Sequence, residues 1–227
     1  MLRRVRTLEG LNLSALDGHA GRINDVYFDD QTWRVRYLVA GTGRWPAGIQ
    51  VLIVPSAVSG IDEGLNTIRV EMTRLEIERS PLLDSAMPAY AQVHATDFAG
   101  LAGPMNWGFE GRAVPGGGYL RTYDPHLRSA RHVTGYRVQV SDGELGHVID
   151  LLLDDREWVI PYLITDTTHW RMGRPRVLST GCVDRIEVAT PRIYARVSRE
   201  ALENRVYAPD RLDPPDGAPG AESECAG

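Results

Sequence analysis

The sequence predicts a mainly β (all-β class) protein made of two small antiparallel β-barrels, each followed by a short helix and related by internal duplication. Residues 17–81 align with residues 142–206 at a constant offset of 125, with 17 identities among 65 pairs and no gap. A repeat that keeps one register over this length indicates one structural unit formed twice. Short apolar segments lie between turn residues in each copy, which is typical of strands. Closure of such strands into a barrel removes exposed edges, so barrels are expected.

The identical pairs fall on residue types that shape a β fold. Aspartate and glycine favour tight turns, and large aromatic residues are typical of small cores. Because both kinds repeat in register, the two copies should share their loops as well as their strands. The principal pairs are Asp17-Gly18 with Asp142-Gly143, Gly21 with Gly146, Asp29-Asp30 with Asp154-Asp155, Trp33 with Trp158, Tyr37 with Tyr162, and Trp45 with Trp170.

The first copy contains six candidate strands. In the third, aromatic and β-branched residues alternate with arginines, which predicts one buried face and one exposed face. The buried face should carry Trp33, Val35, Tyr37 and Val39, and the exposed face Arg34 and Arg36. The six segments are residues 10–16, 21–28, 33–39, 49–54, 58–61 and 67–72.

A short helix should close each copy. Thr73 followed three residues later by Glu76 forms a capping box, which predicts a helix over residues 74–79 that ends before Pro81. In the second copy Ser198 replaces the threonine and Ala201 replaces the glutamate. Only half of the box is retained there, and the helix is expected over residues 199–204.

These patterns divide the chain into four parts. The first barrel is expected over residues 5–82 and the second over residues 131–207. Residues 83–130 are rich in glycine, proline and aromatic residues, which indicates an irregular connector. Residues 208–227 are polar and proline-rich, which predicts a disordered tail.

The repeated stretches resemble a known family. The segments DGHAGRINDVYFDDQTWRVRYLV and SDGELGHVIDLLLDDREWVIPYLITDTTHW, and the ends VEMTRLEIERSP and ARVSREALENRV, look like the PRC-barrel domain. That domain occurs in the cytoplasmic part of the photosynthetic reaction centre H subunit and in a ribosome maturation factor. The whole chain resembles bacterial proteins with two such barrels in tandem. The resemblance implies a fold and a habit of protein–protein contact, and it implies no catalytic residues.

Composition narrows the function classes. The net charge of −5 argues against a non-specific nucleic-acid binder, which would carry a concentrated basic surface. No apolar segment reaches the length needed to span a bilayer, and no signal-peptide core follows the first residues. Cys182 and Cys225 are expected to form neither a disulfide framework nor a metal set. A cytoplasmic protein is the resulting expectation.

A repeated set of aspartates is the strongest polar signal. Clustered carboxylates could bind a divalent cation, but no further carboxylate is spaced to complete its shell. The preferred interpretation is that Asp29-Asp30 and Asp154-Asp155 are hairpin-turn residues that bind local backbone. The full set is Asp25, Asp29 and Asp30 with Asp150, Asp154 and Asp155. No cofactor or metal is therefore expected.

One surface changes chemistry between the copies. Pro46, Ile49 and Val51 of the first copy correspond to arginines in the second, beside a histidine. Such a patch is a candidate docking surface for a partner that carries carboxylates or phosphates, although tolerated arginines in a solvated loop would look the same. Trp45 and Trp170 are candidate stacking residues or core caps. The predicted partner-binding residues are His169, Trp170, Arg171, Arg174, Arg176 and Trp45.

Three functions remain open from the sequence. The favoured one is a non-enzymatic adaptor for an unidentified protein partner, with oligomerisation possible and no direct nucleic-acid contact. A ribosome- or RNA-processing-associated factor is the second. The third is a small-ligand binder or enzyme with a site between the barrels, lined by Trp107, Trp45 or Trp170.

Overall fold

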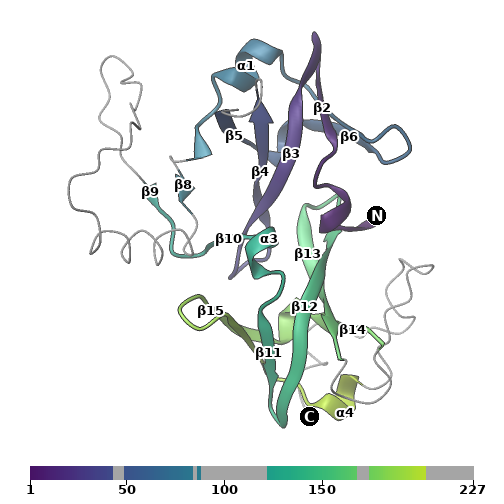
Figure 1. Cartoon of the computed structure of the whole chain (residues 1–227), viewed down its shortest axis with the longest axis vertical. Helices are drawn as coiled ribbons and strands as arrows, with labels where there is room; N and C mark the ends of the chain where they lie inside the picture. The colour runs from purple at the N-terminus through teal and green to yellow at the C-terminus, as the bar shows by residue number, and fades with distance from the viewer. Residues whose placement is uncertain (43–48, 84–85, 88–121, 168–173, 203–227) are drawn as a thin grey trace.

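The computed structural model is a mainly β molecule with two seven-stranded sheets arranged one above the other along its long axis (Figure 1). A third, two-stranded sheet pairs β8 (Ala86–Met87) with β9 (Thr122–Tyr123). The structure describes residues 1–42, 49–83, 86–87, 122–167 and 174–202. None of the helices in these ranges has the length and apolar character needed to cross a lipid bilayer. The connector between residues 88 and 121 and the predicted tail lie outside the described residues.

The first sheet has seven strands in the order β5-β4-β3-β2-β7-β6, with β10 paired to β3. Neighbouring strands are antiparallel except for the parallel pair β2 and β7. The strands are β2 (Asn12–Ala15), β3 (Gly18–Asp29), β4 (Val35–Thr42), β5 (Ile49–Ile53), β6 (Val58–Asp62), β7 (Thr67–Val70) and β10 (Leu127–Ser129). The 3-10 helix η2 (Pro55–Ala57) joins β5 to β6, and α1 (Arg74–Glu78) follows β7.

The second sheet has the same strand order. It runs β14-β13-β12-β11-β16-β15, with β1 paired to β12. Within the described part of this sheet, the one parallel pair is β11 with β16, which corresponds to β2 with β7 of the first sheet. The strands are β11 (Arg137–Val140), β12 (Gly143–Asp154), β13 (Val159–Asp166), β14 (Arg176–Ser179), β15 (Val183–Glu187), β16 (Arg192–Ala195) and β1 (Leu2–Arg4), with η4 (Thr180–Cys182) and α4 (Arg199–Leu202).

The two sheets exchange their leading strands. β1 precedes the first sheet in the chain but pairs with β12 of the second, whereas β10 precedes the second sheet but pairs with β3 of the first. Each strand is followed by a short helix, η1 (Val5–Thr7) or α3 (Ala130–Val133). The exchanged segments lie outside the predicted domain limits, since β1 precedes residue 5 and β10 falls within the predicted connector.

Neither sheet closes through hydrogen bonds in the described part of the chain. β5 and β6 remain the two ends of the first sheet, as β14 and β15 do in the second. η2 and η4 carry the chain from one end strand to the other. The mainly β prediction is confirmed as two seven-stranded sheets, and full barrel closure is not.

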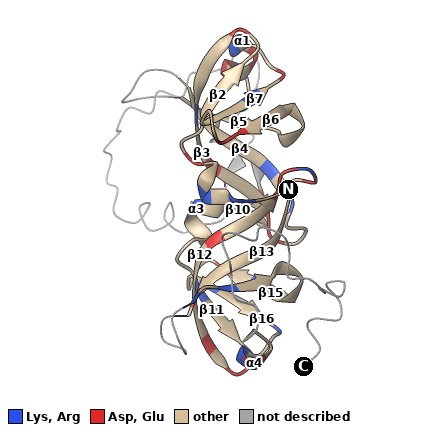
Figure 2. Cartoon of the chain, turned by 90° about the vertical axis from the view of Figure 1, so that its right-hand side faces the viewer, with Lys and Arg blue, Asp and Glu red and all other residues tan. Residues whose placement is uncertain are grey.

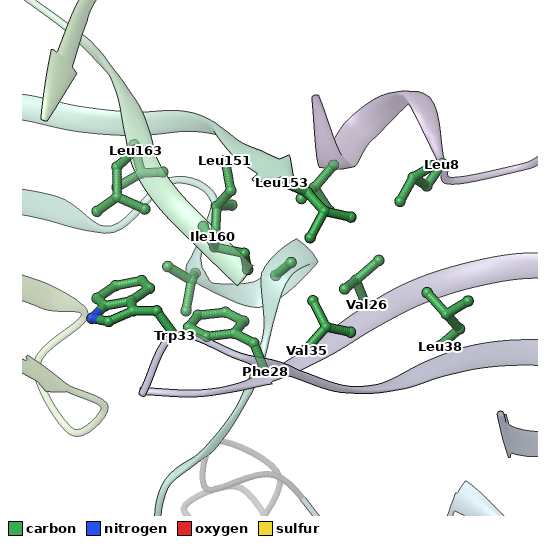
Figure 3. Close-up of a cluster of buried hydrophobic side chains, with 14 of the residues drawn as sticks. Leu8, Val26, Phe28, Trp33, Val35, Leu38, Leu151, Leu153, Ile160 and Leu163 are labelled. Atoms are coloured by element: carbon green, nitrogen blue, oxygen red, sulfur yellow. The ribbon is translucent and has the colours of Figure 1, made fainter. Parts of the chain in front are cut away.

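One hydrophobic core runs through both sheets. Figure 3 shows Phe28, Trp33 and Val35 of the first sheet facing Leu151 and Ile160 of the second. The rings of Phe28 and Trp33 stack with centroids 5.3 Å apart. Sharing apolar surface in this way suits two units that are each small for an independent core.

A β-bulge changes the predicted faces of β4. Tyr27 pairs with Tyr37, but the next residue, Phe28, pairs with Val35, so Arg36 is the extra residue. Val35 therefore lies in the shared core, whereas Tyr37 and Val39 lie on the opposite face. The prediction of one common face was wrong because strict alternation does not hold across a bulge. The second hydrophobic cluster on that opposite face, which we call the outer cluster, contains Tyr27, Val39, Leu52 and Leu127, with Tyr37 and Leu83 against it.

The predicted capping box is present. The Thr73 side chain accepts a hydrogen bond from the Glu76 backbone, and the Glu76 carboxylate accepts one from the Thr73 backbone at 2.7 Å. In the second copy the Ala201 backbone donates to the Ser198 hydroxyl at 3.3 Å. The full and half boxes agree with the sequence prediction.

Cys182 differs from the sequence prediction. It is buried at the end of η4 and is disulfide-bonded. The expectation that no cysteine forms a disulfide is wrong for this residue. The cysteines therefore give no support to the expected cytoplasmic location.

Candidate functional site: the junction between the two sheets

The first aspartate of each Asp-Asp pair stabilises its own turn, as predicted. The Asp29 carboxylate accepts hydrogen bonds from the backbones of Gln31 and Thr32 at 3.0 and 2.9 Å. Burial alone would raise the pKa of Asp29, but the bonds from Thr32 and Gln31 lower it overall. Asp154 accepts a bond from the Arg156 backbone at 3.0 Å, which lowers its pKa.

The second aspartate of the first pair binds the exchanged strand instead. Asp30 Oδ2 lies 2.5 Å from Nη2 of Arg128 on β10, and Asp30 Oδ1 lies 2.9 Å from Nδ1 of His126. The Asp30 backbone also donates to the carbonyl of His126. Burial raises the pKa of Asp30, although Arg128 and His126 oppose this effect.

Asp155 makes the matching contacts in the other sheet. Its Oδ2 lies 2.5 Å from Nε of Arg3 on β1, and its Oδ1 lies 2.7 Å from the amino group of Met1. Burial would raise the pKa of Asp155, but these two partners lower it overall. The turn interpretation of the Asp-Asp pairs is therefore correct for their first members only.

A third pair of aspartates, which lies within the long strands β3 and β12, also holds the exchanged segments. Asp25 accepts hydrogen bonds from the Ser129 hydroxyl at 2.5 Å and from the Arg131 backbone at 3.1 Å. In the second sheet Asp150 binds Nε of Arg4 at 2.6 Å and the Arg6 backbone at 3.2 Å. Each carboxylate thus ties the other copy's leading segment to the middle of a long strand.

The two Asp-Asp hairpins also bind each other directly. The Val35 backbone donates to the Trp158 carbonyl, and the Ile160 backbone donates to the Trp33 carbonyl, both at 2.8 Å. Trp33 and Trp158 have positive φ values of 56° and 53°, a conformation that costs free energy in residues other than glycine. That conformation brings the hairpin turns together in a near-symmetric contact.

A cavity of about 430 Å³ lies beside the first junction. The first sheet contributes one wall and the exchanged segment contributes the other. Burial raises the pKa of Asp25, which lines this cavity, and bonds from Ser129 and the backbone only partly offset it. The lining residues are Asn24, Asp25, Tyr27, Val39, Gln50 and Leu83 with Ser129, Arg131 and His132.

The predicted arginine patch is only partly visible. Arg174 is exposed, whereas Arg176 is buried on β14, with its Nε and Nη1 atoms lacking a hydrogen-bond partner. His169, Trp170, Arg171 and Trp45 lie outside the described residues, as does Trp107.

The carboxylates of the junction are engaged in contacts within the fold. They are bound to arginines, hydroxyls and backbone N–H groups, which leaves few acceptor positions for a metal ion. Within the described ranges, no group of three or more histidine, cysteine or acidic side chains is placed to hold a metal.

The comparison with known families bears on the first sheet. Residues 3–77 match the family model of the PRC-barrel domain. This part of the chain is therefore similar to the PRC-barrel domain. The match begins within β1, so it includes the strand that pairs with the other sheet. A comparison with curated proteins finds no match.

The strand exchange was missed in the sequence, although a signal for it exists. The offset of 125 continues upstream of residue 17, into the segments that become β1 and β10. Leu2, Arg3, Arg6 and Gly10 correspond to Leu127, Arg128, Arg131 and Gly135. Extending the alignment would place residues 126–135 with the second copy instead of the connector. The alignment alone would not show which sheet the strand joins.

Proposed function

We propose that the chain is a non-enzymatic adaptor for protein–protein contacts, built from two PRC-barrels related by duplication. The observation that carries the proposal is the reciprocal exchange of β1 and β10. It joins two equivalent sheets into one body with a shared core, which holds two related surfaces at a fixed spacing. The equal strand orders at an offset of 125 support the duplication.

The use of the ionisable groups supports a role without catalysis. An enzyme needs an acid, base or nucleophile that is free to react. The repeated aspartates instead hold the exchanged segments, through Arg128 and Ser129 in one sheet and Arg3 and Arg4 in the other.

The surface charge favours a protein partner over a nucleic acid. Figure 2 shows acidic and basic residues together near both ends of the molecule, around α1 and α4. Exposed acids there include Asp17 and Glu76 at one end and Asp142 and Glu200 at the other. Nucleic-acid binders concentrate positive charge, whereas acids and arginines are mixed at these ends, as in the pair of Asp17 with Arg74. A cytoplasmic location is part of the proposal.

The proposed working face is the arginine patch of the second copy, where Arg174 is exposed. Its equivalent in the first copy is Ile49, so a partner that binds arginine would distinguish the two copies. Because Arg176 is buried, the accessible charge comes from Arg174 within the described residues.

A crosslinked pull-down from the native cell tests the proposal. The bait is the full chain, compared with the double variant Arg171→Glu and Arg174→Glu. Arg156→Glu is the control, because Arg156 is exposed on a different turn. Loss of one reproducible partner in the double variant alone, with an unchanged melting temperature, supports the proposal. Unchanged capture contradicts it. Ribosomal proteins that remain bound after a high-salt wash would favour the ribosome-associated role.

A further inference from the structure

The cavity beside Asp25 has the size and position of a ligand site. Its volume of about 430 Å³ falls within the range of small-molecule pockets. Its walls come from the outer face of the first sheet and from the segment β10–α3 that belongs to the second copy. A site of this kind exists only when the strands are exchanged.

The cavity offers the carboxylate of Asp25 and the guanidinium of Arg131, with the imidazole of His132 as a further ionisable group. Asp25 Oδ1 already accepts two backbone hydrogen bonds, from Val26 at 2.7 Å and Arg131 at 3.1 Å. Oδ2 accepts one bond, from the Ser129 hydroxyl, and a carboxylate oxygen can accept two. The exposed side chain of Arg131 also lines the cavity and supplies a guanidinium, which suits a carboxylate.

The remaining walls combine amides with apolar groups. Asn24 and Gln50 can each donate and accept hydrogen bonds, while Val39 and Leu83 present aliphatic surface. Pockets that orient a small ligand typically have this mixture of an apolar wall and a few polar groups.

The second copy does not retain this chemistry. The counterparts of Asn24 and Gln50 at the offset of 125 are Ile149 and Pro175, although Asp25 has its counterpart in Asp150. The shared aspartate is explained by the strand exchange, which occurs in both sheets. The amides take no part in the strand exchange, although the Asn24 side chain also packs against Gly41, whose counterpart is Asp166. Their presence in the first copy alone gives its cavity a different chemistry.

We propose that this cavity binds a small zwitterion of the α-amino-acid type, with its ammonium group at Asp25 and its carboxylate at Arg131. The apolar part of the ligand lies against Val39 and Leu83. A zwitterion adds no net charge to a cavity in which one carboxylate and one guanidinium already offset each other's charge, beside His132. This binding site goes beyond the adaptor function and does not depend on it.

Burial of Asp25 is consistent with a cationic ligand group. Burial raises its pKa because the ionised carboxylate is poorly solvated there. An ammonium group at the free position on Oδ2 would stabilise the ionised form.

Calorimetric titration of the full chain tests the assignment with three matched probes. L-Leucine carries both charged groups, isoamylamine lacks the carboxylate, and 4-methylpentanoate lacks the amine. L-Glutamine, with an amide side chain, tests the amide wall. Saturable binding of either amino acid is expected, with at least about ten-fold weaker binding of both leucine analogues, because each loses a charge-assisted hydrogen bond.

Two substitutions locate the site. Arg131→Ala should weaken amino-acid binding at least about ten-fold, whereas Arg6→Ala, at the equivalent place in the other sheet, should leave it unchanged. Asn24→Ile installs the residue that the second copy carries, so it should fold and bind more weakly. The proposal is overturned if neither amino acid binds, if isoamylamine binds as tightly as leucine, or if Arg131→Ala binds like the unmodified chain.

Discussion

The Arg128 guanidinium on β10 binds the Asp30 carboxylate at the end of β3, with 2.5 Å between Nη2 and Oδ2. Both side chains are more than nine-tenths buried, at 9% and 8% exposure. The pair joins the leading strand of one copy to the sheet of the other. Its counterpart, Arg3 with Asp155, is more exposed, at 15% for each side chain.

Arg128→Ala should destabilise the protein by about 3–5 kcal/mol, because it leaves the Asp30 charge buried without its main partner. Arg3→Ala should cost less, since Asp155 is nearer to solvent and retains the amino group of Met1. Urea unfolding of both variants measures the difference. Arg137→Ala is the control, because its pair with Glu144 is exposed and 3.5 Å long, and a change below about 1 kcal/mol is expected. Equal losses for Arg128→Ala and Arg137→Ala would contradict the structural role.

Asp154 should contribute stability that is lost in acid. Its folded-state pKa is lowered, chiefly by the bond from the Arg156 backbone, so the folded chain binds its proton less readily than the unfolded chain does. The contribution is complete above the unfolded value of 3.8 and disappears as the pH falls through the lower folded pKa. Asp154→Asn should therefore lose less stability than the unmodified chain as the pH falls below 3.8. The measurement is the free energy of unfolding as a function of pH.

Asp25 should show the opposite sign. Burial raises its folded-state pKa, so the folded chain keeps this proton to a higher pH than the unfolded chain. Its contribution to stability therefore decreases as the pH rises from 3.8 through the folded pKa. Asp25→Asn should remove the decrease in stability above pH 3.8. It should leave unchanged the loss of stability at lower pH that Asp154 causes. A pH profile of Asp25→Asn that parallels that of the unmodified chain would refute the assignment.

The two junction tryptophans should differ in their effect on stability. Trp33 is 7% exposed and stacks on Phe28, whereas Trp158 is only partly buried. Trp33→Ala should cost about 3–5 kcal/mol, as expected for loss of a large buried aromatic side chain. Trp158→Ala should cost clearly less. Thermal unfolding of both variants provides the measurement, and equal effects would argue against the asymmetric core.

The sequence predicted the strands and helix ends well where local chemistry decides them. The capping box at Thr73 and Glu76 and the turn at Asp29 depend on neighbours within four residues, and both are present. The faces of Tyr37 and Val39 depend on a bulge, which alternation cannot show. The roles of Asp25 and Asp30 depend on residues about one hundred positions later in the chain. The alignment assigns those later residues to the second copy. Sequence patterning therefore identified these aspartates as repeated but not their partners.

Each half of the chain should require the other for folding. Residues 1–87 lack β10, and residues 122–227 lack β1, so each half would leave one side of β3 or β12 without its exchanged strand. Because the core is also shared, co-expressed halves should form a 1:1 complex that co-purifies. Removing residues 1–7 from the first half deletes β1, the Arg3 and Arg4 contacts and all of η1, and should abolish the complex. Two halves that elute separately as stable, folded monomers would show that the exchange is not needed for the fold.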